Sequence, residues 1–184
     1  MNDAGPSDER LAGAAELVIT GFRDKGLSLA TCESITGGGI GWTLTRIAGA
    51  SDVFRGGLIT YASELKSTLA GVDAEFIAVH GVINRTTALE MAEGAAQVCA
   101  ADVAVAVTGT AGPTGEDGEP PGTVWLGVCL DGHALAHRCA FPGERDAVRR
   151  WTVLACLNAL GRLVSTPQRP VLDDALWDDL LTGE

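Results

Sequence analysis

The sequence predicts an α/β fold, a three-layer α/β/α sandwich built around a mixed, largely parallel sheet. First, segments whose apolar residues have helical spacing alternate with short strand-like segments. Second, residues 102–110 are apolar almost throughout, which is typical of a central strand buried on both faces. Third, 46% of the 184 residues are hydrophobic and 20% are charged, as in globular proteins. The length suits one domain with one core.

The first half of the chain begins with a helix and continues with alternating strands and helices. From Glu9 to Lys25 the apolar residues recur with helical spacing, and Gly26 ends that helix. The short helices of this half are each closed by a glycine. In chain order, the remaining elements expected here are a strand at 27–32, a helix at 39–49, a strand at 54–62, and helices at 63–71 and 73–81.

The second half contains two long helices, a buried strand and a hairpin. Asn84 is a suitable N-cap for a helix that runs through Ala100. Residues 111–122 combine Gly, Pro and acidic residues, which predicts an exposed loop. The other elements expected are the strand at 102–110, a hairpin made of 123–131 and 133–141 around Gly132, and a helix at 144–164 that packs on the sheet.

Three segments are expected along the chain: a disordered N-terminus at 1–8, one domain at 9–164, and a linker with an acidic amphipathic tail at 165–184. Two prolines mark the linker. Residues 171–184 carry five acids and place their leucines near one helical face. Packing on the chain's own domain or a sister subunit, and recruitment of another protein, both account for that apolar stripe.

Charge and composition exclude several classes of protein. The formal net charge is −11, so nucleic acid is not an expected partner. No uncharged apolar run is long enough for a membrane span and no signal peptide pattern occurs, so we expect a cytoplasmic protein without a membrane partner. The five cysteines are scattered, which favours reduced thiols over a metal site. Neither a Walker motif nor a dinucleotide fingerprint occurs, and no cofactor is expected.

Ser34 is the first candidate for chemistry, because it follows a predicted strand and lies in the turn that opens a glycine-rich helix. The backbone amides of Thr36, Gly37 and Gly38 at that helix start are suited to bind an oxyanion or a phosphate. The alternative is that Ser34 simply caps the helix. The run of glycines argues against a simple cap, since each glycine costs helix stability.

A serine nucleophile needs a base, and Lys66 is a better candidate than any histidine. His80, His133 and His137 stand beside a helix-ending glycine or in the predicted hairpin, and we expect structural roles for them. Tyr61 precedes Lys66 by five residues, so both side chains can point into one pocket at the sheet edge. A desolvated ammonium there would have a lowered pKa, and the phenol could relay a proton. The alternative is a surface lysine beside a half-buried tyrosine.

From about residue 9 to 164 the chain resembles the C-terminal domain of the CinA competence-damage proteins, a family that includes stand-alone nicotinamide mononucleotide deamidases. Six motifs in the family's order carry the resemblance: Glu33-Ser34-Ile35-Thr36-Gly37-Gly38, Tyr61 with Lys66, Ala88-Leu89-Glu90-Met91-Ala92, Thr108-Gly109-Thr110-Ala111-Gly112-Pro113, Gly122-Thr123-Val124-Trp125 and Phe141-Pro142-Gly143-Glu144-Arg145.

The resemblance implies an α/β/α amidohydrolase that releases ammonia from nicotinamide mononucleotide and leaves nicotinate mononucleotide, without cofactor or metal, as a homo-oligomer. It implies that Ser34 attacks the carboxamide, Lys66 takes the serine proton, and Tyr61 orients or relays it. The oxyanion would be held by amides at residues 36–38 or in the 108–109 turn. The substrate-binding residues it implies are Glu33, Thr36, Gly37, Gly38, Ser63, Asn84, Thr108, Gly109, Ala111, Gly112 and Arg145.

The chain departs from the family pattern in two places, at Ala62 and Ser63 and again at Asn84. The family commonly has Tyr-Ser-Asn where this chain has Tyr61-Ala62-Ser63, and commonly a serine at the position of Asn84. Both changes alter expected polar contacts to the substrate. The sequence therefore leaves an alternative open, a noncatalytic pyridine-nucleotide-binding or interaction protein with the same fold.

Overall fold

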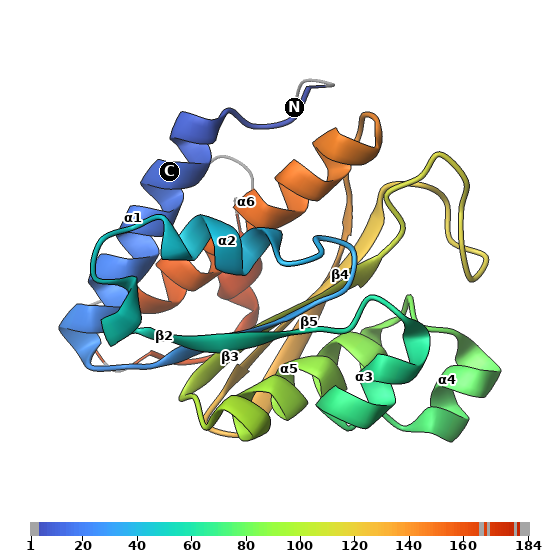
Figure 1. The fold of residues 1–184 in the computed structure, drawn as a ribbon, viewed down its shortest axis with the longest axis horizontal. Helices are drawn as coiled ribbons and strands as arrows, with labels where there is room; N and C mark the ends of the chain where they lie inside the picture. The colour runs from blue at the N-terminus through green and yellow to red at the C-terminus, as the bar shows by residue number, and fades with distance from the viewer. Residues whose placement is uncertain (1–3, 166–167, 169, 179, 181–184) are drawn as a thin grey trace.

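A five-stranded sheet lies between two layers of helices in the computed structural model, which describes residues 4–165, 168, 170–178 and 180 (Figure 1). The elements are α1 Asp8–Lys25, β1 Leu29–Glu33, α2 Gly39–Thr45, η1 Ala50–Asp52, β2 Phe54–Ile59, α3 Ser63–Ala70, α4 Ala74–His80, α5 Arg85–Cys99, β3 Val103–Gly109, β4 Thr123–Leu130, β5 His133–Ala140, α6 Arg145–Ser165 and η2 Asp174–Trp177. Helices α1, α2 and α6 cover one face, and α3, α4 and α5 lie on the other (Figure 1). The predicted α/β/α architecture is confirmed.

The strand order is β2-β1-β3-β4-β5, and the sheet is mixed, as predicted. Strand β1 pairs in parallel with both β2 and β3, whereas β4 pairs antiparallel with both β3 and β5. The two kinds of pairing are therefore equally frequent, where the sequence predicted a largely parallel sheet. The antiparallel half follows from the β4–β5 hairpin, whose turn residues Asp131 and Gly132 have φ angles of 51° and 79°.

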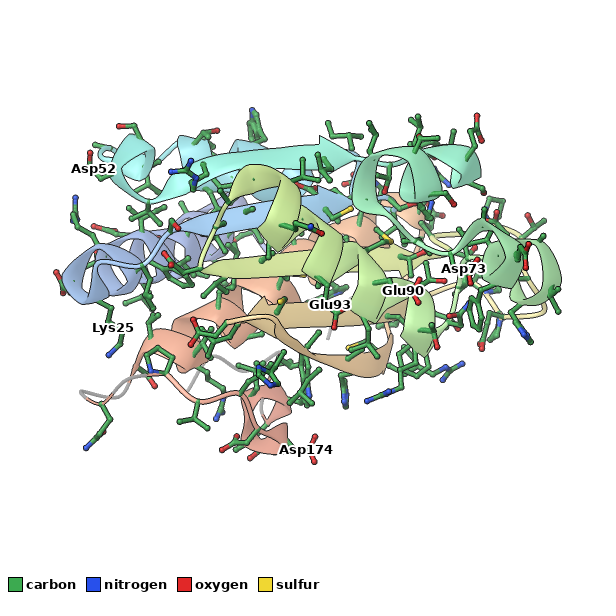
Figure 2. All side chains as sticks on the ribbon, turned by 90° about the horizontal axis from the view of Figure 1, so that it is seen from below. Lys25, Asp52, Asp73, Glu90, Glu93 and Asp174 are labelled. Atoms are coloured by element: carbon green, nitrogen blue, oxygen red, sulfur yellow. The ribbon has the colours of Figure 1, made fainter. Side chains whose placement is uncertain are left out.

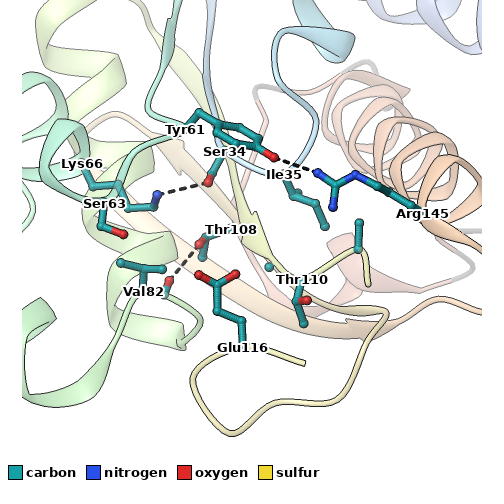
Figure 3. A pocket seen from close by; sticks show the side chains of 12 residues that line it. Ser34, Ile35, Tyr61, Ser63, Lys66, Val82, Thr108, Thr110, Glu116 and Arg145 are labelled. Atoms are coloured by element: carbon teal, nitrogen blue, oxygen red, sulfur yellow. Dashed lines mark hydrogen bonds between the residues drawn. The ribbon is translucent and has the colours of Figure 1, made fainter. Parts of the chain in front are cut away.

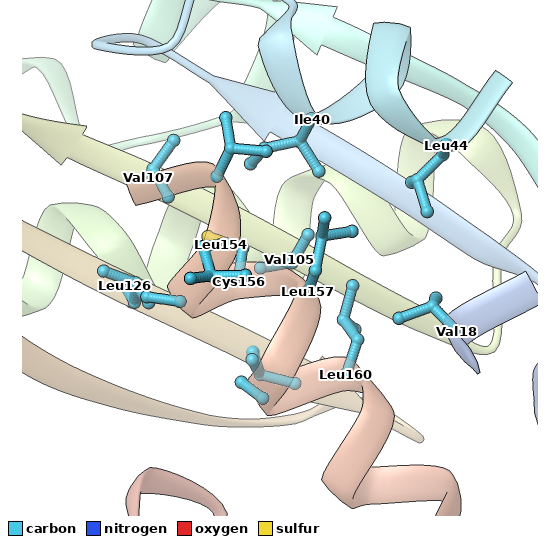
Figure 4. Packing of buried hydrophobic residues seen from close by; sticks show 14 of the residues in the cluster. Val18, Ile40, Leu44, Val105, Val107, Leu126, Leu154, Cys156, Leu157 and Leu160 are labelled. Carbon is cyan, nitrogen blue, oxygen red and sulfur yellow. The ribbon is translucent and has the colours of Figure 1, made fainter. Parts of the chain in front are cut away.

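The larger core lies between the sheet and helices α1, α2 and α6. Alternate residues of β3 point to this face, and Figure 4 shows Val105 and Val107 opposite Leu154, Leu157 and Leu160 of α6. All five side chains are at most 1% exposed. Because α6 is apolar on most of its circumference, it is buried along nearly its whole length.

The second core lies under α5 and is built from smaller side chains. Ala104 and Ala106, which alternate with the valines of β3, meet Met91, Ala92 and Ala95 of α5. Small residues on both sides let the helix approach the sheet closely. The outer face of α5 carries acidic side chains (Figure 2), and one of them, Glu90, accepts a hydrogen bond from the amide of Asp73 just before α4, at 3.0 Å.

Both ends of the chain make contacts with the domain. Arg150 donates to the carbonyl of Pro6 at 2.6 Å and Ser7 caps α1; residues 1–3 of the segment predicted to be disordered lie outside the described residues. In the amphipathic tail, Asp174–Trp177 forms a short 3-10 helix.

The tail packs on its own domain. Leu176 and Leu180 are buried, and the ring of Trp177 stacks on His137 of β5 with centroids 5.4 Å apart. Asn158 of α6 donates to the carbonyl of Leu180 at 2.7 Å. The apolar residues of the tail therefore find their surface on α6 and β5, and residues 166–167, 169, 179 and 181–184 lie outside the described part.

Among the described residues, no helix combines the length and the apolar character needed to cross a bilayer.

We predict opposite effects for two helical glycines. A Cβ at Gly94 of α5 would lie 1.8 Å from the carbonyl oxygen of Ala70, so Gly94→Ala should lower the free energy of unfolding by about 1–3 kcal/mol. A Cβ at Gly13 of α1 meets nothing within 4 Å, so Gly13→Ala should raise that free energy by up to about 1 kcal/mol through helix propensity. Denaturant unfolding of both variants measures the difference. Equal stability of the two variants would contradict the close packing of α3 on α5.

Candidate active site

A small cavity of about 130 Å³ opens where strands β1, β2 and β3 end (Figure 3). Because these strands are parallel, their carboxyl ends meet at one edge of the sheet, where α/β proteins commonly bind ligands. The residues that line the cavity are Ser34, Ile35, Tyr61, Ser63, Lys66, Val82, Thr108, Gly109, Thr110, Ala111, Glu116 and Arg145. Predicted site residues from four separate motifs thus meet at one place.

Ser34 and Lys66 are in direct contact. The Nζ of Lys66 lies 3.1 Å from the Oγ of Ser34, and it donates a second hydrogen bond to the carbonyl of Thr60 at 2.8 Å. Ser34 is the first residue after β1, and its amide bonds to the carbonyl of Val107 in β3 at 3.1 Å. Lys66 comes from the first turn of α3. The serine and its candidate base are therefore held by the sheet and by the helix that follows β2.

Lys66 is 1% exposed and Ser34 is 8% exposed. Burial lowers the pKa of the Lys66 ammonium, since the charged form loses its hydration, and nearby groups such as Cys32 and Glu116 oppose the shift. A lowered pKa increases the fraction of neutral amine. The carbonyl of Thr60 accepts a hydrogen bond from one N–H of that neutral amine. The lone pair of the amine nitrogen can then accept a hydrogen bond from the hydroxyl of Ser34.

The Glu33 carboxylate does not line the cavity. It is 1% exposed and accepts hydrogen bonds from the hydroxyl of Thr36 at 2.6 Å and from the amides of Ile40 and Gly41 at 3.0 and 2.9 Å. The amides of Ile40 and Gly41 in the first turn of α2 therefore bind an anion from the chain itself, and the amides of residues 36–38, where the sequence predicted an anion from the substrate, precede this turn. Glu33 thus links the end of β1 to the first turn of α2, and the turn that contains Ser34 lies between these two elements.

The glycine-rich turn is held from the other side by α6. Arg149 donates to the carbonyls of Ile35 and Thr36 at 3.3 and 2.9 Å. The amide of Gly37, an expected oxyanion donor, bonds to the carbonyl of Ser34 at 3.1 Å. Gly37 and Gly38 have φ angles of 60° and 96°, so the backbone conformation itself requires glycine. Neither these glycines nor Thr36 lines the cavity, and their role here is to shape the turn.

The turn after β3 faces the cavity instead. Thr108, Gly109 and Ala111, for which the resemblance implies substrate binding, all line it, and Thr110 joins them. The hydroxyl of Thr108 donates to the carbonyl of Val82 at 2.8 Å, which fixes the wall of the cavity to the segment before α5. Of the two turns proposed for the oxyanion, this is the one that lines the cavity together with Ser34.

Tyr61 and Arg145 form the mouth of the cavity. The guanidinium of Arg145 donates to the hydroxyl of Tyr61 at 2.7 Å and to the carbonyl of Gly112 at 3.1 Å. Tyr61 is 58% exposed, and its hydroxyl points toward Arg145 and away from Lys66 (Figure 3). The structure therefore pairs Tyr61 with Arg145, whereas the sequence analysis placed it in a proton relay with Lys66.

Ser63 and Asn84, two of the three positions that depart from the family pattern, have different surroundings. Ser63, the first residue of α3, lines the cavity. Asn84 caps α5: its side chain accepts from the amide of Thr87 at 2.9 Å and donates to the carbonyl of Gly81 at 3.0 Å. Because both ends of the Asn84 amide are used locally, this residue does not reach the cavity.

Several lining residues were not found by sequence reasoning: Ile35, Val82, Thr110 and Glu116. Glu116 lies in the loop at 111–122, whose glycines and prolines predict a loop but not its path. Its position depends on Asp117, whose carboxylate accepts the amides of Val82 and Ile83. The contact of Lys66 with the carbonyl of Thr60 was also not predicted, since every residue has a backbone carbonyl and its partners cannot be inferred from residue type.

The remaining chemistry-bearing side chains lie elsewhere. The five cysteines are free thiols, and His80 packs on Phe76 with ring centroids 4.5 Å apart. Within the described residues, no group of three or more His, Cys, Asp or Glu side chains is arranged to hold a metal ion.

Comparison with known proteins gives consistent results. The CinA C-terminal domain family matches residues 11–164. A nicotinamide-nucleotide amidohydrolase, PncC, from Escherichia coli K12 is 38% identical over 84% of this chain and 94% of its own length. A CinA-like protein from Geobacter sulfurreducens is 44% identical over 79% of this chain, and the chain spans only about a third of the length of such relatives, 35% in this case.

Solved structures agree. A CinA superfamily protein from Klebsiella pneumoniae has a TM-score of 0.82 and 33% identity, with 84% of this chain and 98% of that one covered. A competence/damage inducible protein from Agrobacterium tumefaciens has a TM-score of 0.79 and 39% identity, covering 85% and 95% of the two chains. The resemblance stated from the sequence motifs is confirmed.

We predict that Glu33→Gln destabilises the fold and slows any reaction at Ser34. The substitution puts an amide NH₂ among three hydrogen-bond donors, so at least one buried donor loses its acceptor, at a cost of about 1–3 kcal/mol of unfolding free energy. Glu93→Gln, on the outer face of α5, is the control and should change little. Thermal or denaturant unfolding measures both, and a Glu33→Gln variant as stable as the control would contradict the role given to this carboxylate.

Proposed function

The chain belongs to the CinA C-terminal domain family, and from this premise we propose that it is a nicotinamide-nucleotide amidohydrolase that converts nicotinamide mononucleotide to nicotinate mononucleotide and ammonia. The observation that carries the proposal is the buried Lys66 amine 3.1 Å from the Ser34 hydroxyl, inside a cavity at the carboxyl ends of the parallel strands. The activity in the name of the Escherichia coli relative supports the same reaction.

In the first half of the reaction, the neutral amine of Lys66 accepts the proton of the Ser34 hydroxyl. The serine oxygen then attacks the carboxamide carbon, and the carbonyl oxygen becomes an oxyanion. The lowered pKa of Lys66 supports its role as base, because an ammonium cannot accept a proton. We assign the oxyanion to backbone donors of Gly109 and Ala111, since both residues line the cavity, whereas the amide of Thr110 donates to the carbonyl of Thr123 at 2.9 Å.

The second half restores the enzyme. The Lys66 ammonium returns its proton to the departing nitrogen, the C–N bond breaks, and ammonia leaves a serine ester. A water molecule then gives one proton to Lys66 and attacks the ester carbon, which releases the nicotinate carboxyl group; this group loses its remaining proton to solvent and becomes the carboxylate. The Ser34 oxygen takes back the proton. Each proton transfer passes through the same amine, as in other serine hydrolases that use a single base.

The size of the cavity suggests that only part of the substrate lies inside it. At about 130 Å³ the cavity is smaller than most sites that enclose a whole ligand of nucleotide size. We propose that it holds the carboxamide and part of the ring, with the ribose and phosphate at the mouth near Tyr61 and Arg145. Arg145 supplies a fixed positive charge there, and the exposed ring of Tyr61 offers a flat apolar surface.

Assembly as a homo-oligomer, a cytoplasmic location and the absence of nucleic acid binding stay predictions. The division of the chain into a domain at 9–164 and a tail at 165–184 is likewise proposed.

The direct test of the function is ammonia release from nicotinamide mononucleotide by the purified full chain, compared with Ser34→Ala. We expect the wild-type protein to release ammonia and the variant to lose the activity by on the order of 10⁴-fold or more, since the nucleophile is gone. Nucleotide binding measured by calorimetry should persist in the variant. Retained activity would exclude Ser34 as nucleophile, and wild-type binding without ammonia release would favour the noncatalytic alternative.

The rate should depend on pH through Lys66. Because burial lowers its pKa, the neutral base accumulates below the pH range of an ordinary lysine. The deamidation rate should therefore rise with pH and level off below that range. Lys66→Arg keeps the charge but cannot deprotonate, so we expect it to lose about 10²–10⁴-fold in kcat, nearly as much as Lys66→Ala. If Lys66→Arg instead retained most of the rate, Lys66 would act only as a fixed charge.

A further inference from the structure

Glu116 is an acidic residue within a cavity whose other ionisable lining groups are Lys66, Arg145 and Tyr61. Its side chain extends from the loop at 111–122 toward the cavity beside Thr108 and Thr110 (Figure 3). No step of the reaction described above is assigned to this carboxylate, and its charge opposes the lowering of the Lys66 pKa.

The loop that carries Glu116 is held in place by its own hydrogen bonds. The backbone of Glu116 exchanges two hydrogen bonds with Glu119, at 3.1 and 2.9 Å, across a turn formed by Asp117 and Gly118. The carboxylate of Asp117 accepts the amides of Val82 and Ile83, which fixes the turn to the segment before α5.

Gly81, in the connection between α4 and α5, leaves space for the carboxylate of Asp117. A Cβ at Gly81 would lie 2.3 Å from the carboxyl carbon of Asp117, so a side chain there would displace the loop. The placement of Glu116 is thus built into the packing of the loop on the α4–α5 connection.

The proposed substrate and product differ only at the group that reacts. The carboxamide has N–H donors and no charge, whereas the product carries a carboxylate at the same position. Lys66, when protonated, and Arg145 would both attract that carboxylate and slow its departure. A fixed negative charge in the cavity acts in the opposite sense, because it accepts hydrogen bonds from an amide and repels an anion.

We propose that Glu116 is a specificity-determining residue, which makes the cavity favour the carboxamide substrate over the carboxylate product and so limits product inhibition. The inference rests on the proposed function. Glu116 is exposed to solvent, so screening keeps the effect moderate, on the order of tenfold in the affinity ratio.

The test compares Glu116→Gln with the wild-type full chain in steady-state kinetics. Two constants are measured: KM for nicotinamide mononucleotide and the inhibition constant of nicotinate mononucleotide. We expect the inhibition constant to fall roughly tenfold in Glu116→Gln while KM changes by less than about threefold, since only the product is anionic at the reacting group. Glu116→Asp, which keeps the charge, should restore most of the discrimination.

Glu119→Gln is the matched control. It removes one negative charge from the same loop, but the carboxylate of Glu119 pairs with Arg138 at 2.6 Å and does not line the cavity. We expect both constants to stay at wild-type values in this variant.

Equal changes of both constants in Glu116→Gln would mean a general disturbance of the loop, and no change in their ratio would mean that Glu116 does not discriminate; either result overturns the inference. Failure of the proposed function is seen separately, as a wild-type protein that releases no ammonia.

Discussion

The amine of Lys66 is removed from water and held 3.1 Å from the hydroxyl of Ser34, and the arrangement of the site depends on this contact. Burying an ammonium is unfavourable unless its donors are satisfied, and here the carbonyl of Thr60 and the oxygen of Ser34 accept from it. The same burial lowers the pKa of the lysine, which is what a base for a serine requires. Burial of the Lys66 amine is therefore both unfavourable for folding and necessary for its proposed role as a base. The close packing of α3 on α5, where Gly94 leaves room for the carbonyl of Ala70, keeps the helix that carries Lys66 in place.

The turn that presents Ser34 is fixed by charges from within the chain. Glu33 occupies the amides at the start of α2, and Arg149 of α6 binds the outward carbonyls of Ile35 and Thr36. The walls of the cavity are formed by the turn after β3, the loop that carries Glu116, and the Tyr61–Arg145 pair. Gly37 and Gly38 have positive φ angles that favour glycine, and they do not line the cavity.

Much of the fold was predictable because it depends on local pattern. The valines and alanines that alternate in β3 face two different helix layers, and the helix starting at Asn84 begins where its cap predicts. The convergence of Ser34 with Lys66 was predictable as well, since both follow parallel strands. The sequence alone does not show whether a polar side chain binds the substrate or binds the backbone of its own chain. Glu33 and Asn84, which we expected to bind substrate, instead accept hydrogen bonds from backbone amides of the chain. Glu116 was missed because its position is set by contacts of Asp117 across 34 or 35 residues of sequence.

The central claim, that Lys66 is a base with a lowered pKa, can be measured directly by NMR. The chain has only two lysines, Lys25 and Lys66, so a protein labelled with ¹³C-lysine gives two sets of side-chain signals, and Lys66→Met identifies which belongs to Lys66. Titration of the Lys66 signals with pH reports the pKa of its amine without any substrate. We expect a midpoint below that of an ordinary lysine, about 10.4. A midpoint at or above that value would mean that Lys66 is an ammonium at the pH of the reaction and would contradict its assignment as the base.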